Sequence, residues 1–264
     1  MSNPASSPVI ARPSATAIIL RDGREGIETF MVVRHHEIDF ASGALVFPGG
    51  KVDPQDSVEA WAEFAPFAGS ASNRALVVAA ARETFEEAGL MLARRRGSQA
   101  VVSAEEAHRM VDEHREGLVQ SRTTFLNVVR GEGLVLAMDL MVPFAHWITP
   151  ESVPKRFDTH FFVVAAPIDQ VGAHDGGESV EGVWVAPEQA LRDAEAGKRT
   201  LVFATQLNLQ KLARYRTVAE TVDKTRSAPI VTVMPRMERT AAGRKLLIPA
   251  EADYGGTEFP VPAR

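Results

Sequence analysis

The segment Arg82-Glu83-Thr84-Phe85-Glu86-Glu87-Ala88-Gly89-Leu90 is the most informative part of this sequence. Asn73 can cap a helix that runs through the segment to about Leu90, and Gly89 stands where glycine commonly ends a helix. At about 100° per residue, the side chains of such a helix separate by polarity. One face carries Val77, Val78, Ala81, Phe85, Ala88 and Leu92, and the other carries Arg82, Glu83, Glu86 and Glu87. The sequence therefore predicts an amphipathic helix whose polar face is mostly carboxylate.

The carboxylates of this polar face repel one another. Glu83 lies three residues before Glu86 and four before Glu87, spacings at which like charges cost about 0.2–0.5 kcal/mol per pair on an isolated helix. A solvated acidic surface is the common explanation of such a run. A bound Mg²⁺ is the alternative, because hard divalent cations prefer carboxylate oxygens and the glycine-rich segment Pro48-Gly49-Gly50 lies upstream.

The rest of the chain mixes strand-like and helical segments. Residues 17–20 and 28–34 flank a turn-rich stretch and predict a β-hairpin, and residues 44–47 predict a third strand that ends in a tight loop at Gly49 and Gly50. Further strands are predicted at 135–142, 159–164, 180–185, 230–234 and 245–248, and further helices at 103–130, 188–196 and 204–222. This mixture predicts an α/β sandwich.

No internal repeat and no clear linker divides the sequence, which favours a single folded domain. We expect a flexible N-terminal tail over residues 1–14 and a C-terminal tail over residues 255–264. The domain itself is expected over residues 15–254, with a helical insertion near residues 103–130.

The composition limits the classes of function. The chain has 264 residues, a formal net charge of −5 and no cysteine. Proteins that bind nucleic acid or anionic membranes need clustered Lys and Arg, so the charge argues against both kinds of partner. The lack of cysteine excludes disulfides, thiolate metal sites and cysteine nucleophiles. No basic leader with an apolar core and no membrane-spanning apolar run occurs, so we expect a cytoplasmic protein.

Residues 82–90 resemble the second half of the Nudix box, G-x5-E-x7-R-E-U-x-E-E-x-G-U, in which U is a bulky apolar residue. Eight of the nine positions agree, counting the unconstrained ones, and Thr84 stands where an apolar residue is expected. Gly50 fits the opening glycine, and Asp56 occupies the position of the first glutamate. Because 25 residues instead of seven separate Asp56 from Arg82, the sequence resembles a box interrupted by an insert of 18 residues.

An expanded box is typical of one Nudix branch, which includes coenzyme A diphosphatases of peroxisomes and mitochondria. The resemblance to this branch extends over residues 15–254 and includes residues 147–150, 156–159 and 161–162. It implies a Nudix α/β/α sandwich with a mixed sheet, a helical insertion and a C-terminal extension. The implied reaction is hydrolysis of a diphosphate linkage in a nucleoside diphosphate derivative. Coenzyme A or an acyl-CoA is the first candidate, although similar boxes occur with different substrates.

The resemblance also implies roles for individual residues. Glu86 and Glu87 would hold Mg²⁺ or Mn²⁺, with the carbonyl oxygen of Gly50 as a further ligand. Glu83 would bind the ion or accept a proton from the attacking water, and Arg82 would orient the carboxylates. The bound ion would lower the pKa of a water molecule and neutralise charge on the diphosphate.

Acidic residues outside the predicted helix are weaker candidates. Glu178 precedes the strand that carries Trp184 and resembles the acidic loop that follows the box in many relatives, so it is a candidate ligand or base. Glu181 and Asp175 compete with it for this role. Asp56 could substitute for the missing glutamate of the box. Its shorter side chain and the insert that follows it favour instead the interpretation as an ordinary loop aspartate.

Histidines are not expected to take part in catalysis. His108 and His114 lack the spacing of a metal motif, and His36 lacks the second histidine of H-E-x-x-H. Phosphate could be met by Arg34, His35, His36 or Arg156, but clusters at strand ends are more often solvated or make structural hydrogen bonds. P-loop, G-x-G-x-x-G and G-x-S-x-G motifs are absent, which argues against kinases, dehydrogenases and serine hydrolases.

A non-catalytic Nudix domain that senses a nucleotide ligand is the alternative function. Its motivation is the imperfect first half of the box, with Asp56 and the insert. The helices predicted at 103–130 and 204–222 could cover a substrate or form the contact surface of a homodimer.

Overall fold

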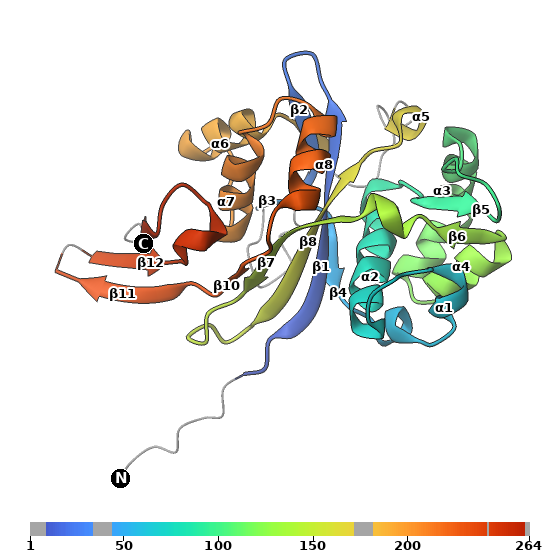
Figure 1. The fold of residues 1–264 in the computed structure, drawn as a ribbon, viewed down its shortest axis with the longest axis horizontal. Helices are drawn as coiled ribbons and strands as arrows, with labels where there is room; N and C mark the ends of the chain where they lie inside the picture. Colours follow the sequence, from blue (N-terminus) through green and yellow to red (C-terminus); the bar gives the residue numbers. More distant parts are fainter. Residues whose placement is uncertain (1–8, 34–43, 172–181, 242, 262–264) are drawn as a thin grey trace, which may run out of the picture.

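A mixed eight-stranded sheet forms the centre of the computed structural model, which describes residues 9–33, 44–171, 182–241 and 243–261 (Figure 1). Its strands are β1 (Arg12–Asp22), β2 (Ile27–Val33), β3 (Leu45–Val46), β4 (Gly49–Lys51), β7 (Val142–Ile148), β8 (Phe157–Ala165), β9 (Gly182–Val185) and β10 (Thr232–Val233). They follow the order β10-β7-β8-β1-β2-β3, with β4 also paired to β1 and β9 to β2. Because β1 and β8 run parallel while β1 and β2 run antiparallel, the predicted mixed sheet is confirmed.

Helices and two small sheets surround this centre. The helices are α1 (Trp61–Phe64), α2 (Ala71–Ala88), α3 (Ala104–Val119), α4 (Phe125–Gly131), α5 (Ile168–Val171), α6 (Pro187–Glu195), α7 (Phe203–Leu212) and α8 (Val218–Ser227), with 3₁₀ helices η1 (Pro54–Ser57), η2 (Met138–Leu140) and η3 (Ala250–Ala252). One small sheet pairs β5 (Ala93–Arg95) with β6 (Leu134–Leu136). The other joins β11 (Arg236–Thr240), β12 (Gly243–Leu247) and β13 (Glu258–Val261).

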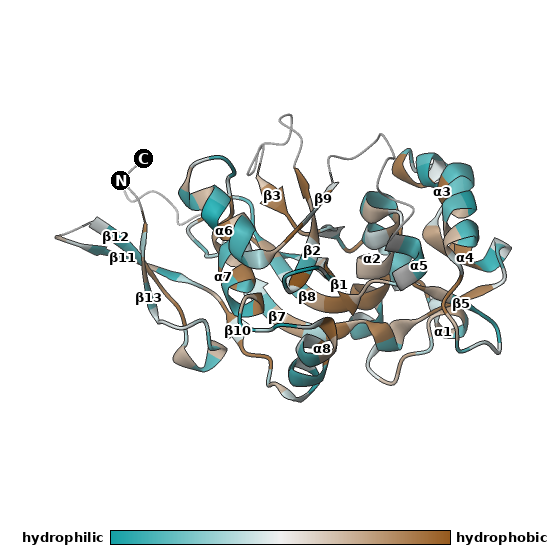
Figure 2. Cartoon of the chain, turned by 90° about the horizontal axis from the view of Figure 1, so that it is seen from above, coloured by the Kyte–Doolittle hydropathy of each residue, from teal (hydrophilic) through white to brown (hydrophobic). Residues whose placement is uncertain are grey.

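Strand β1 shows why the sheet is covered on both faces. Successive side chains of a strand point to opposite faces. Ala17 and Ile19 enter the core that contains α2, whereas Ile18 and Leu20 enter the core that contains α7. All four side chains are fully buried. Figure 2 accordingly shows apolar strands between helices whose outer surfaces are largely hydrophilic. The α/β sandwich follows from this two-sided burial.

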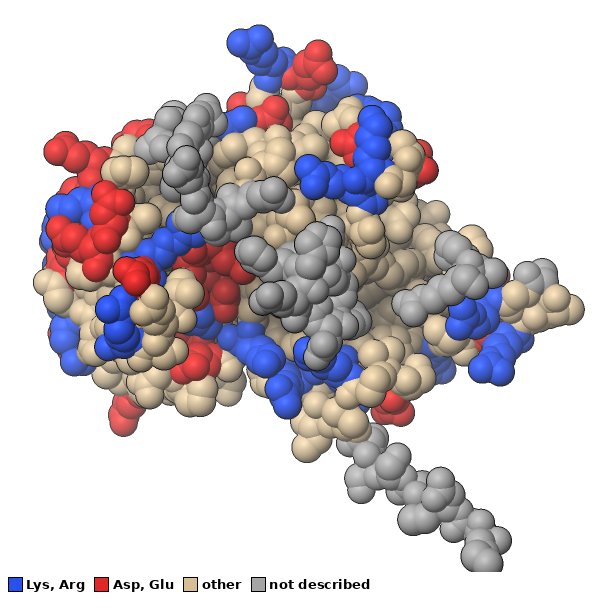
Figure 3. All heavy atoms as spheres, turned by 180° about the vertical axis from the view of Figure 1, so that it is seen from behind, with Lys and Arg blue, Asp and Glu red and all other residues tan. Residues whose placement is uncertain are grey.

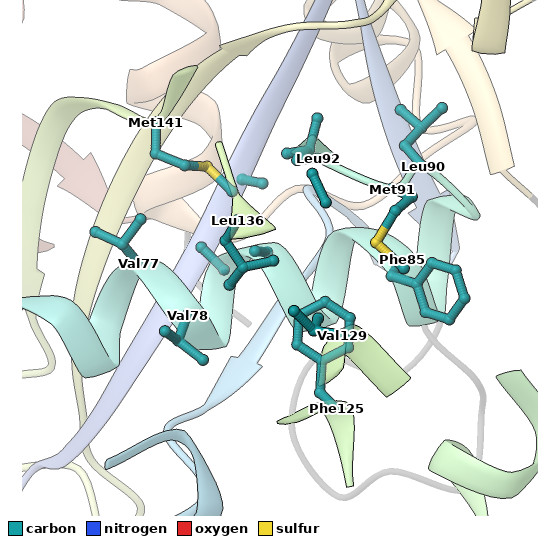
Figure 4. Packing of buried hydrophobic residues seen from close by; sticks show 14 of the residues in the cluster. Val77, Val78, Phe85, Leu90, Met91, Leu92, Phe125, Val129, Leu136 and Met141 are labelled. Atoms are coloured by element: carbon teal, nitrogen blue, oxygen red, sulfur yellow. The ribbon is translucent and has the colours of Figure 1, made fainter. Parts of the chain in front are cut away.

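The apolar face of α2 is confirmed. All six side chains predicted for that face are buried: Val77, Val78, Ala81, Phe85, Ala88 and Leu92. Phe85 is fully buried, and its ring centroid lies 6.0 Å from that of Phe125 on α4. Figure 4 shows these rings packed with aliphatic side chains beside the helix. Burying a side chain of this size contributes about 1.5–3 kcal/mol, so α2 is fixed by packing on one face and leaves its carboxylates on the other.

Several predicted boundaries differ from the structure. Helix α2 begins earlier than predicted, because Ser70 caps it by accepting a hydrogen bond from Asn73 N at 3.2 Å. Residues 135–142 contain strand β6 and the 3₁₀ helix η2, and only the last of them belongs to β7. The helical region 103–130 consists of α3 and α4, and the predicted strand at 180–185 is described from Gly182.

The prediction of one long helix over residues 204–222 is wrong. The chain forms α7 and α8, with a break between Ala213 and Thr217. Thr217 has an extended backbone and accepts a hydrogen bond from Glu220 N at 3.1 Å, so it caps the N-terminus of α8. A threonine three residues before a glutamate is itself a signal for the start of a helix. Here this signal overrides the helical pattern that continues through residues 204–222.

The predicted tail boundaries are also wrong. Strand β1 begins at Arg12, and β13 covers Glu258–Val261 within the region taken as a C-terminal tail. Paired with β12, β13 completes a sheet that extends from the body of the molecule (Figures 1 and 2). No helix of the described residues is both long and apolar enough to span a membrane.

Candidate active site

The acidic face of α2 lies directly beside β4. Gly49 N donates a hydrogen bond to Glu87 Oε2 at 2.9 Å, and a Cβ atom placed on Gly50 would collide with Glu83 Oε1. Helix α2 ends at Gly89, whose φ of 66° is the left-handed conformation that glycine adopts without strain. The structure thus brings Gly50, Glu83 and Glu87 together, although they are far apart in sequence.

Strand β4 corrects the prediction of a tight loop at the two glycines. Gly49 and Gly50 pair with Thr16 and Ala15 of β1. A Cβ on Gly49 would lie 2.7 Å from the Ala15 carbonyl oxygen, so the glycine permits a close approach of two backbones rather than a turn. This pairing anchors the residues beside Glu83 and Glu87 to the central sheet.

Arg82 links the carboxylates on the polar face of α2 through hydrogen bonds. Its Nε and Nη2 atoms each donate to Asp56 at 3.0 Å. Its Nη1 atom donates to Glu83 at 2.9 Å and to Glu86 at 3.2 Å, and Nη2 also reaches the carbonyl oxygen of Lys51 at 3.0 Å. One planar guanidinium therefore fixes the positions of three carboxylates relative to β4.

Asp56 is not the ordinary loop aspartate that its surroundings in the sequence favour. Its side chain is 2% exposed and accepts one bond from Arg82 on each carboxylate oxygen, while its Oδ2 atom also accepts from Asp53 N at 2.8 Å. The short 3₁₀ helix η1 holds it there through a capping box with Asp53. The signal for this role was its position six residues after Gly50, where the Nudix box has a glutamate. Asp56 thus stabilises Arg82.

Burial and charge shift the titration of the site. Burial raises the pKa of Glu86 to about 7, although Arg82 opposes the shift and Glu83 adds to it. Burial also raises the pKa of Glu83, again opposed by Arg82. For Arg82, burial acts to lower the pKa, but the hydrogen bonds with Asp56 and the charge of Glu83 raise it overall. The carboxylates are thus short of positive charge, which a cation would supply.

Arg115 of α3 brings the helical insertion to the same place. Its Nε atom donates to the main-chain oxygen of Glu86 at 2.6 Å. Burial lowers the pKa of Arg115, while the charges of Glu87 and Glu86 raise it. Sequence analysis missed this residue, because nothing in its local pattern indicates that α3 returns to the box helix.

The donor set fits a hard divalent cation such as Mg²⁺. The side chains of Glu83 and Glu86 are 12% and 16% exposed, so their oxygens are held in place yet reachable. Arg82 Nη1 donates to both Glu83 and Glu86, and the groups of three described residues whose ligand atoms lie within 4.8 Å of one another are found elsewhere in the fold. Mg²⁺ keeps several waters and needs only one or two direct carboxylates. The lack of a side chain at Gly50 lets the Glu83 carboxylate lie directly against the backbone of β4.

Two clefts meet at these carboxylates. The cleft on the insertion side, of 1020 Å³, is lined by residues of α2, α3 and α4, including Glu86, Glu87 and Arg115. The cleft on the strand side, of 760 Å³, is lined by β4, β7, β8 and the start of α7. Asp53, Arg82 and Glu83 line both clefts, and Asp56 lines the insertion-side cleft. Figure 3 shows acidic side chains on the floor of a hollow beside Lys and Arg.

The remaining sequence candidates fall into two groups. Arg156 is 8% exposed and donates to the carbonyl oxygens of Thr149 at 3.0 Å and Val9 at 2.7 Å, so its role is structural. His114 joins an ion-pair network with Glu132 on the insertion. The other group lies outside the described residues: Arg34, His35, His36, Asp175, Glu178 and Glu181.

Residues 68–202, just over half of the chain, match the family described as the NUDT19 Nudix domain. The chain belongs to the Nudix hydrolase family. It is 21% identical over 233 residues to the acyl-coenzyme A diphosphatase NUDT19 of Xenopus laevis, covering 73% of this chain and 61% of that protein. A protein of Caenorhabditis elegans that carries the provisional name nudix hydrolase 7 is 27% identical over 205 residues, covering 77% and 61% respectively. This Nudix chain therefore spans 61% of the length of each of these curated relatives.

A solved structure supports the same fold. The crystal structure of a NUDIX hydrolase from Alicyclobacillus acidocaldarius superposes with a TM-score of 0.63 at 25% identity, covering 83% of this chain and 99% of the other. The Nudix fold is thereby confirmed. In this Nudix chain the insert of the box includes α1, whose buried Trp61 donates from Nε1 to the carbonyl oxygen of Gln55 at 2.9 Å. The insert thus packs back onto the segment that holds Asp56.

Proposed function

We propose that this Nudix chain is a Mg²⁺-dependent hydrolase that cleaves the diphosphate linkage of a nucleoside diphosphate derivative, with coenzyme A or an acyl-CoA as the leading substrate. One observation carries the proposal. Arg82, held by buried Asp56, gathers Glu83 and Glu86 beside Gly50 at the point where two clefts meet. A purely solvated acidic face would need neither the buried Asp56 nor the close approach of β4.

The residues that would hold the ion are Glu83, Glu86, Glu87 and the carbonyl oxygen of Gly50. A bound Mg²⁺ lowers the pKa of a water molecule and neutralises charge that develops on phosphate oxygens; Mn²⁺ takes similar oxygen ligands. Arg82 keeps the carboxylates from turning to solvent. Glu83 lines both clefts and accepts one bond from Arg82 through Oε1, so its second oxygen is the leading candidate to accept a proton.

The two clefts suit a substrate with a diphosphate in its middle. The insertion-side cleft presents polar and charged groups such as Arg115, Gln120 and Thr123, whereas the strand-side cleft combines Trp147 and Phe161 with apolar neighbours. A diphosphate held at the carboxylates would place one arm of the substrate in each cleft. Coenzyme A has such an asymmetric shape, with a nucleotide on one side and a long chain on the other. The acyl-coenzyme A diphosphatase among the relatives supports this choice.

The decisive experiment is a panel of substrates incubated with the purified chain and Mg²⁺. The panel contains coenzyme A, an acyl-CoA, ADP-ribose, a dinucleotide and a nucleotide sugar, and the phosphorus-containing products are separated and identified. We expect cleavage of coenzyme A or the acyl-CoA, abolished by a chelator and restored by Mg²⁺. The absence of product from every compound would contradict the proposed hydrolysis, and cleavage of another compound alone would contradict the coenzyme A assignment.

Two variants make the test specific for the box. Glu86→Gln removes a proposed ligand and should lower kcat by about 100-fold or more. Glu63→Gln is the matched control, because Glu63 lines neither cleft, and its side chain is 63% exposed and pairs at the surface with Arg96. Glu63→Gln should keep its activity. Equal activities of the two variants would refute the role of the box carboxylates.

A further inference from the structure

A cluster of two histidines and an aspartate lies on β7 and β8, apart from the residues that line both clefts. His146 and His160 are direct cross-strand partners, and Asp158 stands two residues before His160 on β8. Because side chains alternate along a strand, these three share one face of the sheet. The alternate residues of the same strands, Trp147, Thr159 and Phe161, line the strand-side cleft from the other face.

The ligand atoms of this cluster converge. His146 Nε2 lies 2.5 Å and His160 Nε2 lies 3.8 Å from the same oxygen, Oδ1 of Asp158. The two imidazole rings stack with centroids 4.0 Å apart and planes 18° from parallel. Ligand atoms around a tetrahedral ion with bonds of about 2.1 Å are about 3.4 Å apart, which falls between the two measured distances. Small side-chain rotations would therefore seat an ion among them.

Thr232 orients one of the imidazoles from a third strand. It is the partner of His146 in the parallel pairing of β10 with β7, and its Oγ1 atom lies 2.8 Å from His146 Nδ1. When Nδ1–H donates to this hydroxyl, the lone pair of Nε2 points towards Asp158. A hydrogen bond that fixes the distal nitrogen in this way is the usual support of a metal-binding histidine. A cation between Nε2 and the carboxylate would then satisfy two acceptors that otherwise face each other.

The chemistry of the donors selects the class of ion. Two imidazole nitrogens and one carboxylate suit first-row transition ions, whereas Mg²⁺ prefers oxygen ligands alone. The side chains of His146, Asp158 and His160 are 16%, 35% and 32% exposed, so an ion can reach them from solvent. We propose that these three residues form a second metal site, separate from the box, that binds a divalent transition metal ion of the Zn²⁺ type and crosslinks β7 to β8.

The second described cluster with converging ligand atoms serves as the control. Glu113, His114 and Glu132 also lie within reach of one another. However, Arg109 already bonds to Glu113 and to Glu132 at 2.6 Å each. Its guanidinium supplies the positive charge that an ion would bring, so this cluster is expected to bind Zn²⁺ weakly.

The test is a calorimetric titration of the full chain with Zn²⁺ in saturating Mg²⁺, which occupies the oxygen ligands of the box. The wild type and His114→Ala should bind one Zn²⁺ with similar affinity. His160→Ala should bind it at least about tenfold more weakly, because one of three protein ligands is lost. Asp158→Asn, which changes no volume, provides a second variant, and thermal melts without Zn²⁺ verify that each variant is folded.

A spectroscopic readout identifies the ligands independently. Co²⁺ bound in place of Zn²⁺ should give visible absorption bands in the wild type and in His114→Ala, and these bands should be lost in His160→Ala and Asp158→Asn. The proposal is overturned if the wild type binds no Zn²⁺ in saturating Mg²⁺. It is equally overturned if His160→Ala and Asp158→Asn keep the affinity of the wild type. Neither result bears on hydrolysis at the box.

Discussion

Replacing Asp56 by asparagine tests how Arg82 is held beside the carboxylates of α2. Asp56 accepts three hydrogen bonds, from Nε and Nη2 of Arg82 at 3.0 Å each and from Asp53 N at 2.8 Å. Asparagine keeps the shape of the side chain but has one acceptor oxygen and no charge. If that oxygen takes the place of Oδ2, the new amide group faces the Nε–H of Arg82, so two donors meet.

The expected loss of stability follows from burial. The side chains of Asp56 and Arg82 are 2% and 13% exposed, and removal of one partner of a buried ion pair costs about 3–5 kcal/mol. Because two of the three hydrogen bonds can survive, we expect Asp56→Asn to lower the free energy of unfolding by about 3 kcal/mol, at the low end of that range.

Urea unfolding followed by circular dichroism measures this difference. The matched control is Glu63→Gln, which breaks the pair of Glu63 with Arg96 at 2.7 Å on the surface, where the side chains are 63% and 51% exposed. Exposed pairs contribute at most about 1 kcal/mol. If Asp56→Asn loses no more stability than Glu63→Gln, Asp56 does not anchor Arg82 and the reasoning is refuted.

Three further predictions concern the glycines and the acidic face. Gly50→Ala places a methyl group against Glu83 and should lower the rate of hydrolysis at least about tenfold. Gly131→Ala is the control, because Gly131 has open space around it, and it should leave the rate unchanged in the same assay. Because burial raises the pKa of Glu86 to about 7, the ion-free protein should gain stability as pH falls from 8 to 6. Mg²⁺ should then raise the melting temperature more at pH 8 than at pH 6. An equal rise in melting temperature at both pH values would contradict this titration of Glu86. Gly89→Ala puts alanine at a φ of 66° and should destabilise by about 1 kcal/mol in urea unfolding, and no loss would contradict this account of the helix end.

The helix that carries the box was predictable because several independent sequence signals indicate it. The apolar period of α2, the glycine at its end and the box residues all indicate the same element, and its predicted apolar face is buried. Its start was not predictable to the residue, because Ser70 and Asn73 are both good caps and the intervening residues tolerate either choice. The break at Thr217 had a local signal, but continuous helical propensity concealed it.

The parts that could not be predicted depend on long-range contacts. The Gly49-Gly50 pair has the composition of a turn, and only the proximity of β1 makes it a strand. Asp56 becomes a buried partner because the insert returns the chain to Arg82. Arg115 reaches Glu86 only because α3 packs against α2. The expectation for Glu178 concerns residues outside the described ranges and stays a prediction.

Anomalous diffraction from a crystal grown with Mn²⁺ tests the central claim most directly. The claim is that Glu83, Glu86 and Glu87 hold a divalent cation beside Gly50. We predict a strong anomalous peak within coordination distance of at least two of these carboxylates, near the backbone of β4. A map with no peak there, and with these side chains turned away from β4 into solvent, would contradict the account.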